Sequence, residues 1–517
     1  MRSSSLDCLA SACATVLLFG MAPAAAGEPL VVGTRTCLFL DDRFVAEQAG
    51  LQRTWHQGKP NPQPAIVPTR PWEKWPHLFG SALYDPRSKL YKMWYTDIPV
   101  WTDRGGVFYA ESTDARAWKK PELGLVDIKG SRANNCVLLN AELPNVFLDP
   151  KETDPQARFK MLVWRGRFRF KGKTVFGHIL YSSGDGKHWN LIGPTAGPEQ
   201  PEESYPRQVH DTNQVIWDPL AGRYLGDYRT FAPHPGRPGW VRELWGPKRP
   251  KAIVLNRDGY RRAVGISTSK RLAGGWTPIH IVLKADGLDD AKAKKLSRGP
   301  EPDWAELYVM PLFVYGNHYL GMLTLLYQID AKDTVAGSGD LQLTFSHDGK
   351  TWYRHPRRQP LIAQNSAKLI PVFAAGNEPL EMGDEIWVFY TEATGTHAEE
   401  GTPSRLRAAR WRKDGFVSLD CADKGSLTTP PLLVQGKELR VNFGGNKGSS
   451  LRVAVLDDRG KPVAGFAADD CNPFTGDAVS HTMTWKKNPG LSGLAGKPVR
   501  LRFELAKGRL WSFHFGN

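Results

Sequence analysis

The sequence predicts an all-β protein in which a five-bladed β-propeller is followed by a small antiparallel β-sandwich domain. The main observation is a strand, a tight turn rich in Asp, Pro, Gly or Asn, and a second strand, which recur five times at intervals of about 65 to 100 residues. Each copy is typical of a β-hairpin. Such a repeat cannot bury both of its faces alone, and antiparallel repeats stack most simply around a closed ring. The five copies begin at Ala82, Val146, Val215, Leu312 and Leu380.

A second motif, of the form S-x-D-x-x-x-W, lies in the gaps between the hairpins. It occupies residues 112–118, 183–189 and 346–352, with a degenerate copy at 269–276. Asp and Gly favour a tight turn, Ser supports the turn with a local hydrogen bond, and Trp packs between neighbouring sheets. We therefore interpret these motifs as scaffold turns, and residues 408–417 as the outer part of the last blade.

Little of the chain has the pattern of an amphipathic helix. Residues 288–296 are the best candidate, and they lie in an insertion of the third repeat. We expect this helix to lie over the surface of the propeller.

The propeller pattern ends near residue 420. Residues 425–431 are linker-like, and short alternating strands with Gly-rich turns fill the last 90 or so residues. This pattern predicts a β-sandwich that is either structural or in contact with carbohydrate. The expected division is a signal peptide at 1–26, a propeller at 27–420 and a sandwich domain at 421–517. The expected sandwich strands are 438–443, 450–456, 462–466, 479–485, 498–505 and 509–515.

The N-terminus resembles a secretory signal peptide. A lone Arg2 precedes an apolar stretch at 14–21, and three alanines precede Gly27. We therefore expect a secreted or periplasmic protein. No later run reaches the roughly 18 apolar residues that a transmembrane helix needs, so no transmembrane anchor is expected.

Four cysteines remain after the expected signal peptide: Cys37, Cys136, Cys421 and Cys471. Export permits disulfides, and the pair to test first is Cys421 with Cys471. Buried free thiols are an equally good interpretation. The spacing of the four matches no metal site.

The formal net charge is +15, with basic runs at 165–173 and 237–251. In an exported protein this charge suits an acidic glycan or an anionic cell surface better than nucleic acid. Arginine in particular pairs well with carboxylate or sulfate groups. The alternative is a charge that only keeps the surface soluble.

The residues just before the first strand of each blade should gather at one mouth of the central channel. Every blade offers at least one carboxylate there, and a ring of carboxylates is stable only if some hold protons, bind cations or meet a polar substrate. These residues are Glu73 and His77, Glu142 and Asn145, His210 and Asp211, Asp303, Trp304 and Glu306, and Asn377 and Glu378.

Glycoside hydrolysis uses such carboxylates, because it needs a protonated acid on the leaving oxygen and an ionised nucleophile or base. We expect Asp211 to be the ionised partner, with His210 and Asn213 nearby to hydrogen-bond it. Glu306 is the expected general acid, since Trp304 and Tyr308 would provide apolar surroundings that raise its pKa. The alternative for each is an ordinary solvated loop acid.

Further residues are expected to contact the substrate. Arg229 ends the second strand of the third blade and could hold a hydroxyl or a carboxylate, and His397 follows the second strand of the fifth. The full set of expected substrate-binding residues is Glu73, His210, Arg229, Asp303, Trp304, Tyr308, Glu378 and His397.

The chain resembles the five-bladed propeller glycosidases of glycoside hydrolase families 32 and 43, especially exported family-32-like proteins of polysaccharide-degrading bacteria. The likeness is carried by the Asp-Pro hairpins, the S-x-D-G-x-x-W turns, W-K-K-P-E-L-G at 118–124 and R-K-D-G-F-V-S at 412–418. It implies a channel active site with three acidic residues and no obligatory organic cofactor. The family 32 motifs W-M-N-D-P-N, R-D-P and E-C are absent, so the expected acids depend on blade position alone.

The sequence therefore predicts an exported glycoside hydrolase for a plant or algal poly- or oligosaccharide, acidic glycans included. Two alternatives stay open. The S-x-D-G-x-x-W turns also resemble the Asp boxes of the six-bladed sialidases, which would need Arg229, two further channel arginines and a Tyr nucleophile. A propeller that only binds carbohydrate is the other, because fold alone does not decide function.

Overall fold

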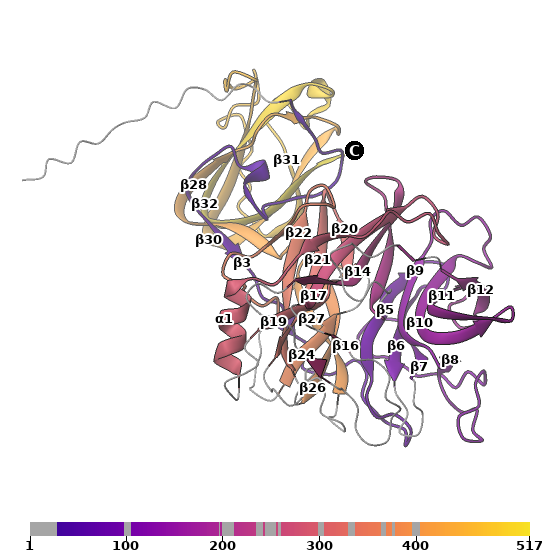
Figure 1. Ribbon diagram of the computed structural model, residues 1–517. Coiled ribbons are helices and arrows are strands. Elements are labelled where there is room, and N and C mark those ends of the chain that lie inside the picture. Colours follow the sequence, from indigo (N-terminus) through magenta and orange to yellow (C-terminus); the bar gives the residue numbers. More distant parts are fainter. Residues whose placement is uncertain are drawn as a thin grey trace, which may run out of the picture.

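The computed structural model describes residues 28–97, 105–195, 197–198, 211–233, 241–242, 255–256, 260–297, 304–328, 337–362, 369–374, 378–394 and 404–517. Within these residues the chain forms five blade-like antiparallel sheets and one larger sheet that contains the C-terminus. Figure 1 shows the larger sheet, coloured tan to yellow, above the blades. The predicted all-β fold with a five-bladed propeller is confirmed.

The first three blades follow the order of the chain. Blade 1 holds β5 (His77–Asp85), β6 (Leu90–Asp97), β7 (Gly106–Ser112) and β8 (Cys136–Leu139). Blade 2 holds β9 (Glu142–Leu148), β10 (Phe159–Phe170), β11 (Lys173–Ser183) and β12 (Asn190–Pro194). Blade 3 holds β13 (Asn213–Asp218), β14 (Arg223–Pro233), β17 (Tyr260–Ser269) and β18 (His280–Leu283), with a small hairpin, β15 (Val241–Arg242) and β16 (Leu255–Asn256), between β14 and β17.

The inner strands of the last two blades are divided. Blade 4 holds β19 (Ala305–Val309), β20 (Leu312–Tyr315), β21 (His318–Gln328), β22 (Gly337–Ser346) and β23 (Trp352–Arg354). Blade 5 holds β24 (Leu369–Ala374), β25 (Leu380–Met382), β26 (Glu385–Thr394) and β27 (Ser404–Arg412). β19 and β20 both pair with β21, and β24 and β25 both pair with β26.

The N-terminal strand β4 (Lys59–Pro60) closes the ring. It pairs with β27, so the outer strand of blade 5 comes from the start of the chain. The sequence analysis placed that outer part at residues 408–417, but residues from Val417 onward already belong to the C-terminal sheet. Joining the two ends of the propeller in one blade removes an open sheet edge without a covalent link.

The S-x-D-x-x-x-W motifs form the expected turns. In each of the three full copies, Oδ1 of Asp114, Asp185 or Asp348 accepts the backbone N–H groups two and three residues later at 2.8 to 2.9 Å. The turns also contact neighbouring blades, because the Trp94 indole of blade 1 donates to the carbonyl oxygen of Gly186 at 2.7 Å. These motifs are therefore scaffold.

The Asp residues of the Asp-Pro hairpins connect each blade to the next. Asp85 of blade 1 accepts two hydrogen bonds from Arg158 of blade 2, at 2.6 and 2.8 Å. Asp149 of blade 2 accepts the Tyr224 hydroxyl of blade 3 at 2.9 Å. Asp218 of blade 3 accepts a tyrosine hydroxyl of blade 4 in the same way. One residue type thus shapes each turn and also ties neighbouring blades together.

We expect Asp85→Asn to lower the free energy of unfolding by about 2 to 4 kcal/mol at neutral pH, because it removes the charge that faces buried Arg158 and Lys92. Burial by itself would raise the pKa of Asp85, but the bonds from Arg158 and Lys92 outweigh it and hold this pKa below its usual range. The stabilisation is therefore complete above about pH 4 and is lost as the pH falls below that value. Urea titrations should show a smaller difference in the free energy of unfolding between wild type and variant at about pH 3 than at neutral pH. A difference that is the same at both pH values would contradict the ion pair as its source.

The single α-helix of the described residues is the one that the sequence predicted. It is α1 (Gly287–Leu296), which lies beside β19 in Figure 1 and begins with a capping box between Asp286 and Asp289. Arg354 holds Asp289 with two bonds of 2.7 Å. Asp290 accepts the backbone N–H of Ala305 at 2.9 Å, so the helix also fixes the start of β19.

The C-terminal sheet contains strands from both ends of the chain. Residue 421, the expected start of this domain, lies inside β28, and the expected strands at 438–443 and 450–456 are one long strand, β30, as are 498–505 and 509–515 in β32. Its strands are β1 (Leu30–Val31), β2 (Cys37–Leu38), β3 (Glu47–Trp55), β28 (Val417–Thr428), β29 (Leu432–Leu433), β30 (Glu438–Leu456), β31 (Ala478–Met483) and β32 (Pro498–Gly516). Short 3-10 helices lie at η1 (Asp42–Phe44) and η2 (Ser492–Leu494).

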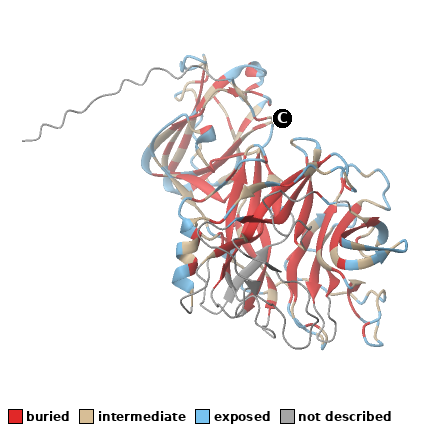
Figure 2. Cartoon of the chain, in the orientation of Figure 1, coloured by how far each residue is buried: buried red, intermediate tan, exposed pale blue. Residues whose placement is uncertain are grey.

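This sheet encloses a hydrophobic core of its own, with Trp485 and Phe513 fully or almost fully buried. Figure 2 shows the buried residues along the strands of both parts of the molecule. The four described cysteines are all buried free thiols, and Cys421 and Cys471 are not bonded to each other. Burial raises the pKa of Cys37 and Cys136 to about 12, so these thiols are unreactive.

Candidate active site at the channel mouth

The inner strands of the blades meet around a small cluster at one end of the channel. Phe79 of β5 and Tyr308 of β19 have ring centroids 6.1 Å apart, although they come from blades 1 and 4. Leu143 of β9 and Ala393 of β26 join the same cluster. Because four blades contribute to it, Tyr308 marks the middle of the channel, and the residues around it form the candidate site.

Asp211 is the accessible part of this site, and buried Arg229 is its partner. Asp211 lies just before β13, and its Oδ1 is 2.6 Å from Nη1 of Arg229 on β14; the Asp211 side chain is 39% exposed and that of Arg229 only 5%. The Arg229 guanidinium lies over the Tyr308 ring, 4.2 Å from its centroid. Burial lowers the pKa of Arg229, but the charge of Asp211, the contacts with Tyr308 and the charge of Glu306 together outweigh this, so the net shift is upward. A permanently charged, buried arginine favours the ionised form of its carboxylate partner.

His178 of blade 2 holds the backbone at Asp211. Its Nε2 lies 3.1 Å from the carbonyl oxygen of Asp211, and its Nδ1 lies 3.1 Å from the side-chain amide of Asn213. Burial lowers the pKa of His178 to about 4, so the ring is neutral near neutral pH. Only one tautomer satisfies both partners: Nε2–H donates to the carbonyl and Nδ1 accepts from the amide. Asn213 thus bonds to His178 here.

Glu306 lies next to the same tyrosine, but in different surroundings from those expected. Its side chain is fully buried, and Oε2 accepts hydrogen bonds from Arg262 and, at 2.9 Å, from Gln328. The Arg262 guanidinium lies 5.3 Å from the Tyr308 ring centroid. The sequence analysis expected an apolar enclosure by Trp304 and Tyr308, but a cation takes that place. Trp304 contributes its carbonyl oxygen, which accepts the backbone N–H of Gln328 at 3.1 Å.

The two carboxylates belong to one electrostatic unit. Arg229 and Arg262 both lie over Tyr308, and the negative charge of Glu306 contributes to the raised pKa of Arg229 as well. The structure therefore brings together Asp211, Arg229, Tyr308 and Glu306, with part of Trp304.

Glu73 has a structural role. Its carboxylate pairs with Lys120 at 2.7 Å and accepts the backbone N–H groups of Thr69 at 2.6 Å and Arg70 at 3.0 Å. These bonds anchor the loop that precedes β5. Because its carboxylate is bonded to these groups and the residue is almost fully buried, Glu73 is not available to bind a substrate.

Glu378 does not reach the mouth. It lies at the break between β24 and β25, close to Leu380, and Leu380 pairs with Trp387 near the start of β26. Glu306, by comparison, pairs with Leu326 near the end of β21. Glu378 is therefore nearer to the hairpin-turn end of the channel than Glu306.

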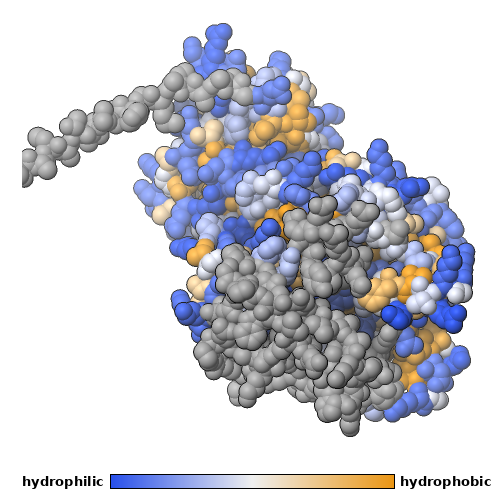
Figure 3. Space-filling view, viewed as in Figure 1, coloured by the Kyte–Doolittle hydropathy of each residue, from blue (hydrophilic) through white to orange (hydrophobic). Residues whose placement is uncertain are grey.

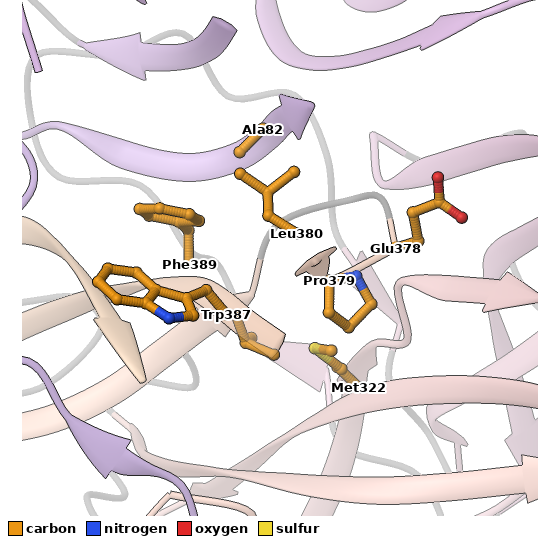
Figure 4. Close-up of a pocket in the computed structure, with 8 residues that line it drawn as sticks. Ala82, Met322, Glu378, Pro379, Leu380, Trp387 and Phe389 are labelled. Carbon is orange, nitrogen blue, oxygen red and sulfur yellow. The ribbon is translucent and has the colours of Figure 1, made fainter. Parts of the chain in front are cut away.

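Glu378 lines a small pocket in which every other lining residue is nonpolar, and its carboxylate points away from Pro379 and Leu380 (Figure 4). Although the residue is exposed, the protein atoms around it desolvate the carboxyl and, with the nearby charge of Glu381, raise its pKa.

Three of the expected substrate-binding residues, His210, Asp303 and His397, lie outside the described residues, as does Asn377. In the part of the chain that is described, no three or more His, Cys, Asp or Glu side chains are placed to hold a metal ion. Nor does any helix in the described ranges have the length and apolar character needed to cross a membrane.

Sequence reasoning missed Arg262, Gln328 and His178. Each lies within a strand, whereas most of the predicted site residues precede an inner strand. The available signal was a charged or polar side chain inside an otherwise apolar strand, as for the two arginines after Tyr260 and for His178 before Ile179. A buried charge of this kind needs a partner, so it indicates an ion pair nearby.

Comparison with known proteins gives structural likeness at low sequence identity. No family model matches the sequence, and no curated protein matches it. Solved structures with a similar fold include an exo-inulinase from Aspergillus awamori, at 13% identity and TM-score 0.39, which covers 88% of this chain and 98% of that enzyme. A fructofuranosidase from Schwanniomyces occidentalis covers 87% of this chain and 96% of its own, at 9% identity and TM-score 0.37.

A glycosyl hydrolase from Bacteroides ovatus is a third example, with 12% identity, a TM-score of 0.40 and coverage of 69% of this chain and 94% of its own. These neighbours are glycoside hydrolases. At such identities the likeness concerns the fold, and the site has to be judged on its own residues.

Proposed function

We propose that the protein is an exported glycoside hydrolase that cleaves a poly- or oligosaccharide at the channel mouth, with Asp211 as the ionised carboxylate and Glu306 as the general acid. The observation that supports this best is the Asp211–Arg229 pair. It provides a partly exposed carboxylate whose charge is maintained by a buried arginine. An ionised carboxylate beside the anomeric carbon is the nucleophile or base that glycoside hydrolysis needs.

Glu306 acts as the acid only after its contact with Arg262 opens. While the ion pair exists, the charged form of Glu306 is favoured. A substrate that draws Arg262 toward itself would leave the carboxyl desolvated beside Tyr308, and desolvation raises the pKa of a carboxylic acid. Substrate binding would in this way prepare the proton donor.

The proposed substrate class rests on the charge of the chain. Both arginines beside Tyr308 are already paired, Arg229 with Asp211 and Arg262 with Glu306, but the whole chain carries a formal net charge of +15, which suits an anionic ligand. We therefore favour an acidic glycan of plant or algal origin. Export rests on the signal-peptide features of residues 1–26.

The test is hydrolysis of a panel of neutral, uronic and sulfated glycans by the purified protein, with the products separated and identified. We expect new reducing ends from at least one acidic member of the panel. If no glycan is cleaved although one binds, catalysis at this site is refuted.

That outcome would favour a second candidate, a propeller that only binds carbohydrate. The enclosure of Glu306 by Arg262 and Gln328 is the specific observation in its favour, because it keeps the expected proton donor away from any ligand in the unliganded protein. Binding that persists without product in wild type and in Glu306→Gln alike would establish it.

A further inference from the structure

The hairpin formed by β10 and β11 extends beyond its own blade. β9 pairs with β10 only between Phe159 and Trp164, and β12 pairs with β11 only between Ile179 and Ser182. The remaining part of the hairpin, 165–178, therefore has no strand beside it within the blade. It leaves the blade at the end where β9 begins, which is the end that carries the candidate site.

The two faces of this hairpin differ. On one face, Phe168 packs against the core between blades 1 and 2, and Phe170 lies against Gly193 of β12. Lys173 is opposite Phe170 and so belongs to this face. The protein covers this face itself, which leaves the other one for a ligand.

The opposite face carries aromatic rings and arginines. The register places Trp164 opposite His178, and Arg167 opposite Phe176. The Trp164 ring contacts both the Phe176 ring, at 5.1 Å between centroids, and the His178 ring, at 5.0 Å. Arg169 follows on the same face. We call Trp164, Phe176, Arg167 and Arg169 the hairpin face.

The hairpin face is exposed and strongly basic. Phe176 is 51% exposed, an unusual state for so large an apolar side chain, and Arg167 and Arg169 are exposed too. Residues 165–173 contain five basic side chains and no acidic one. None of the described acidic side chains forms an ion pair with Arg167 or Arg169. At the margin where β10 and β11 lie in Figure 1, hydrophilic and apolar residues alternate on the surface (Figure 3).

This face is continuous with the candidate site. His178 contacts Trp164 on one side and bonds to the backbone of Asp211 on the other. A chain that lies on the hairpin face would therefore run toward the segment at Asp211. Aromatic rings pack against the apolar faces of sugar rings, and exposed arginines attract carboxylate or sulfate groups.

We propose that the hairpin face binds the chain of an acidic polysaccharide that extends from the site at Asp211. The proposal rests on the proposed function for its occupant, but its binding can be measured without any catalysis. It gives Arg167 and Arg169, which form no ion pair with a described acidic side chain, a role in substrate selection. It also explains why aromatic and basic side chains share one face of the hairpin while the opposite face is packed.

The test compares two variants with the same change in charge. Arg167→Gln/Arg169→Gln removes two charges from the hairpin face, and Lys171→Gln/Lys173→Gln removes two charges from the turn and the opposite face. Binding of oligogalacturonate, oligoalginate and chondroitin sulfate fragments is measured by calorimetry, each beside its methyl-esterified or desulfated form. These residues are exposed, so the thermal unfolding midpoint should stay unchanged in both variants.

We expect at least one acidic oligosaccharide to bind more tightly than its neutral form. The arginine variant should weaken that binding about tenfold, which corresponds to less than 1 kcal/mol for each exposed charge pair. The lysine variant should weaken it far less, and Phe176→Ala should weaken it while leaving its dependence on salt concentration unchanged.

Three outcomes would overturn the proposal. An equal loss of affinity for acidic oligosaccharides in the two double variants would show a general effect of net charge. No preference for any acidic oligosaccharide would exclude the ligand class, and tighter binding of single-stranded DNA than of every glycan would indicate a nucleic-acid surface. If acidic chains bind at the hairpin face but are not cleaved, the proposed hydrolysis fails and the binding surface stands.

Discussion

Asp211→Asn is expected to lower the rate of glycan hydrolysis about a thousandfold while the protein keeps its fold. Asn has the same shape and its amide oxygen can still accept from Arg229, so the contact at Asp211 Oδ1 is retained in neutral form. What disappears is the negative charge that, in the proposed reaction, attacks the anomeric carbon or activates water. The rate of reducing-sugar release from the best glycan of the panel measures the effect.

Asp218→Asn is the matched control. It makes the same substitution at the other end of β13, where the carboxylate bonds to the Tyr319 hydroxyl of the next blade. We expect this variant to lose stability but to keep its activity per folded molecule. If Asp211→Asn hydrolyses glycans at the wild-type rate, Asp211 is not the ionised carboxylate of the reaction.

Arg262→Met is expected to lower the free energy of unfolding by about 3 to 5 kcal/mol, because it leaves Glu306 buried without its cation. Removing one partner of a buried pair costs far more than the pair contributes, since the remaining charge cannot return to water. Met preserves much of the volume of the arginine stem. Urea titration monitored by tryptophan fluorescence measures the loss.

The double variant Arg262→Met/Glu306→Gln separates charge from packing. Glutamine removes the orphaned charge and can still bond to Gln328, so the double variant should recover most of the lost stability. A double variant as unstable as Arg262→Met would instead assign the effect to the lost contact between Arg262 and the Tyr308 ring. Either result shows whether the buried charge of Glu306 is stabilised by Arg262 in the unliganded protein.

The fold could be predicted from sequence in some detail because its determinants are local. Turn chemistry and the alternation of strands identified each blade, and the same reasoning located α1. The role of β4 was missed, because two residues, Lys59 and Pro60, carry no pattern and form a strand only against β27. The two-residue strands β1 and β2 of the C-terminal sheet were missed for the same reason, and the nine-residue β3 was missed as well.

The site was predicted less completely. The rule that site residues precede an inner strand placed Asp211 and Glu306 at one mouth, and in the structure both lie near Tyr308 together with Arg229, which was expected there too. The same rule gave the wrong position for Glu378. The inner strand of blade 5 is divided into β24 and β25, and this places Glu378 farther from the mouth than Glu306. The rule also did not predict the ion pair of Glu306, since its partner Arg262 comes from the third strand of a neighbouring blade.

By itself, the sequence determined the repeat, the turns that the Asp residues shape and the strand ends that approach the channel, because each depends on residues close together in the chain. Only the tertiary structure decided which partners those side chains meet. The hairpin Asp residues became links between blades, Glu73 an anchor for its own loop, and Glu306 one half of a buried ion pair. The physical reason is that a charge is stabilised by whatever lies within a few ångströms of it, and in a propeller those neighbours come from different blades.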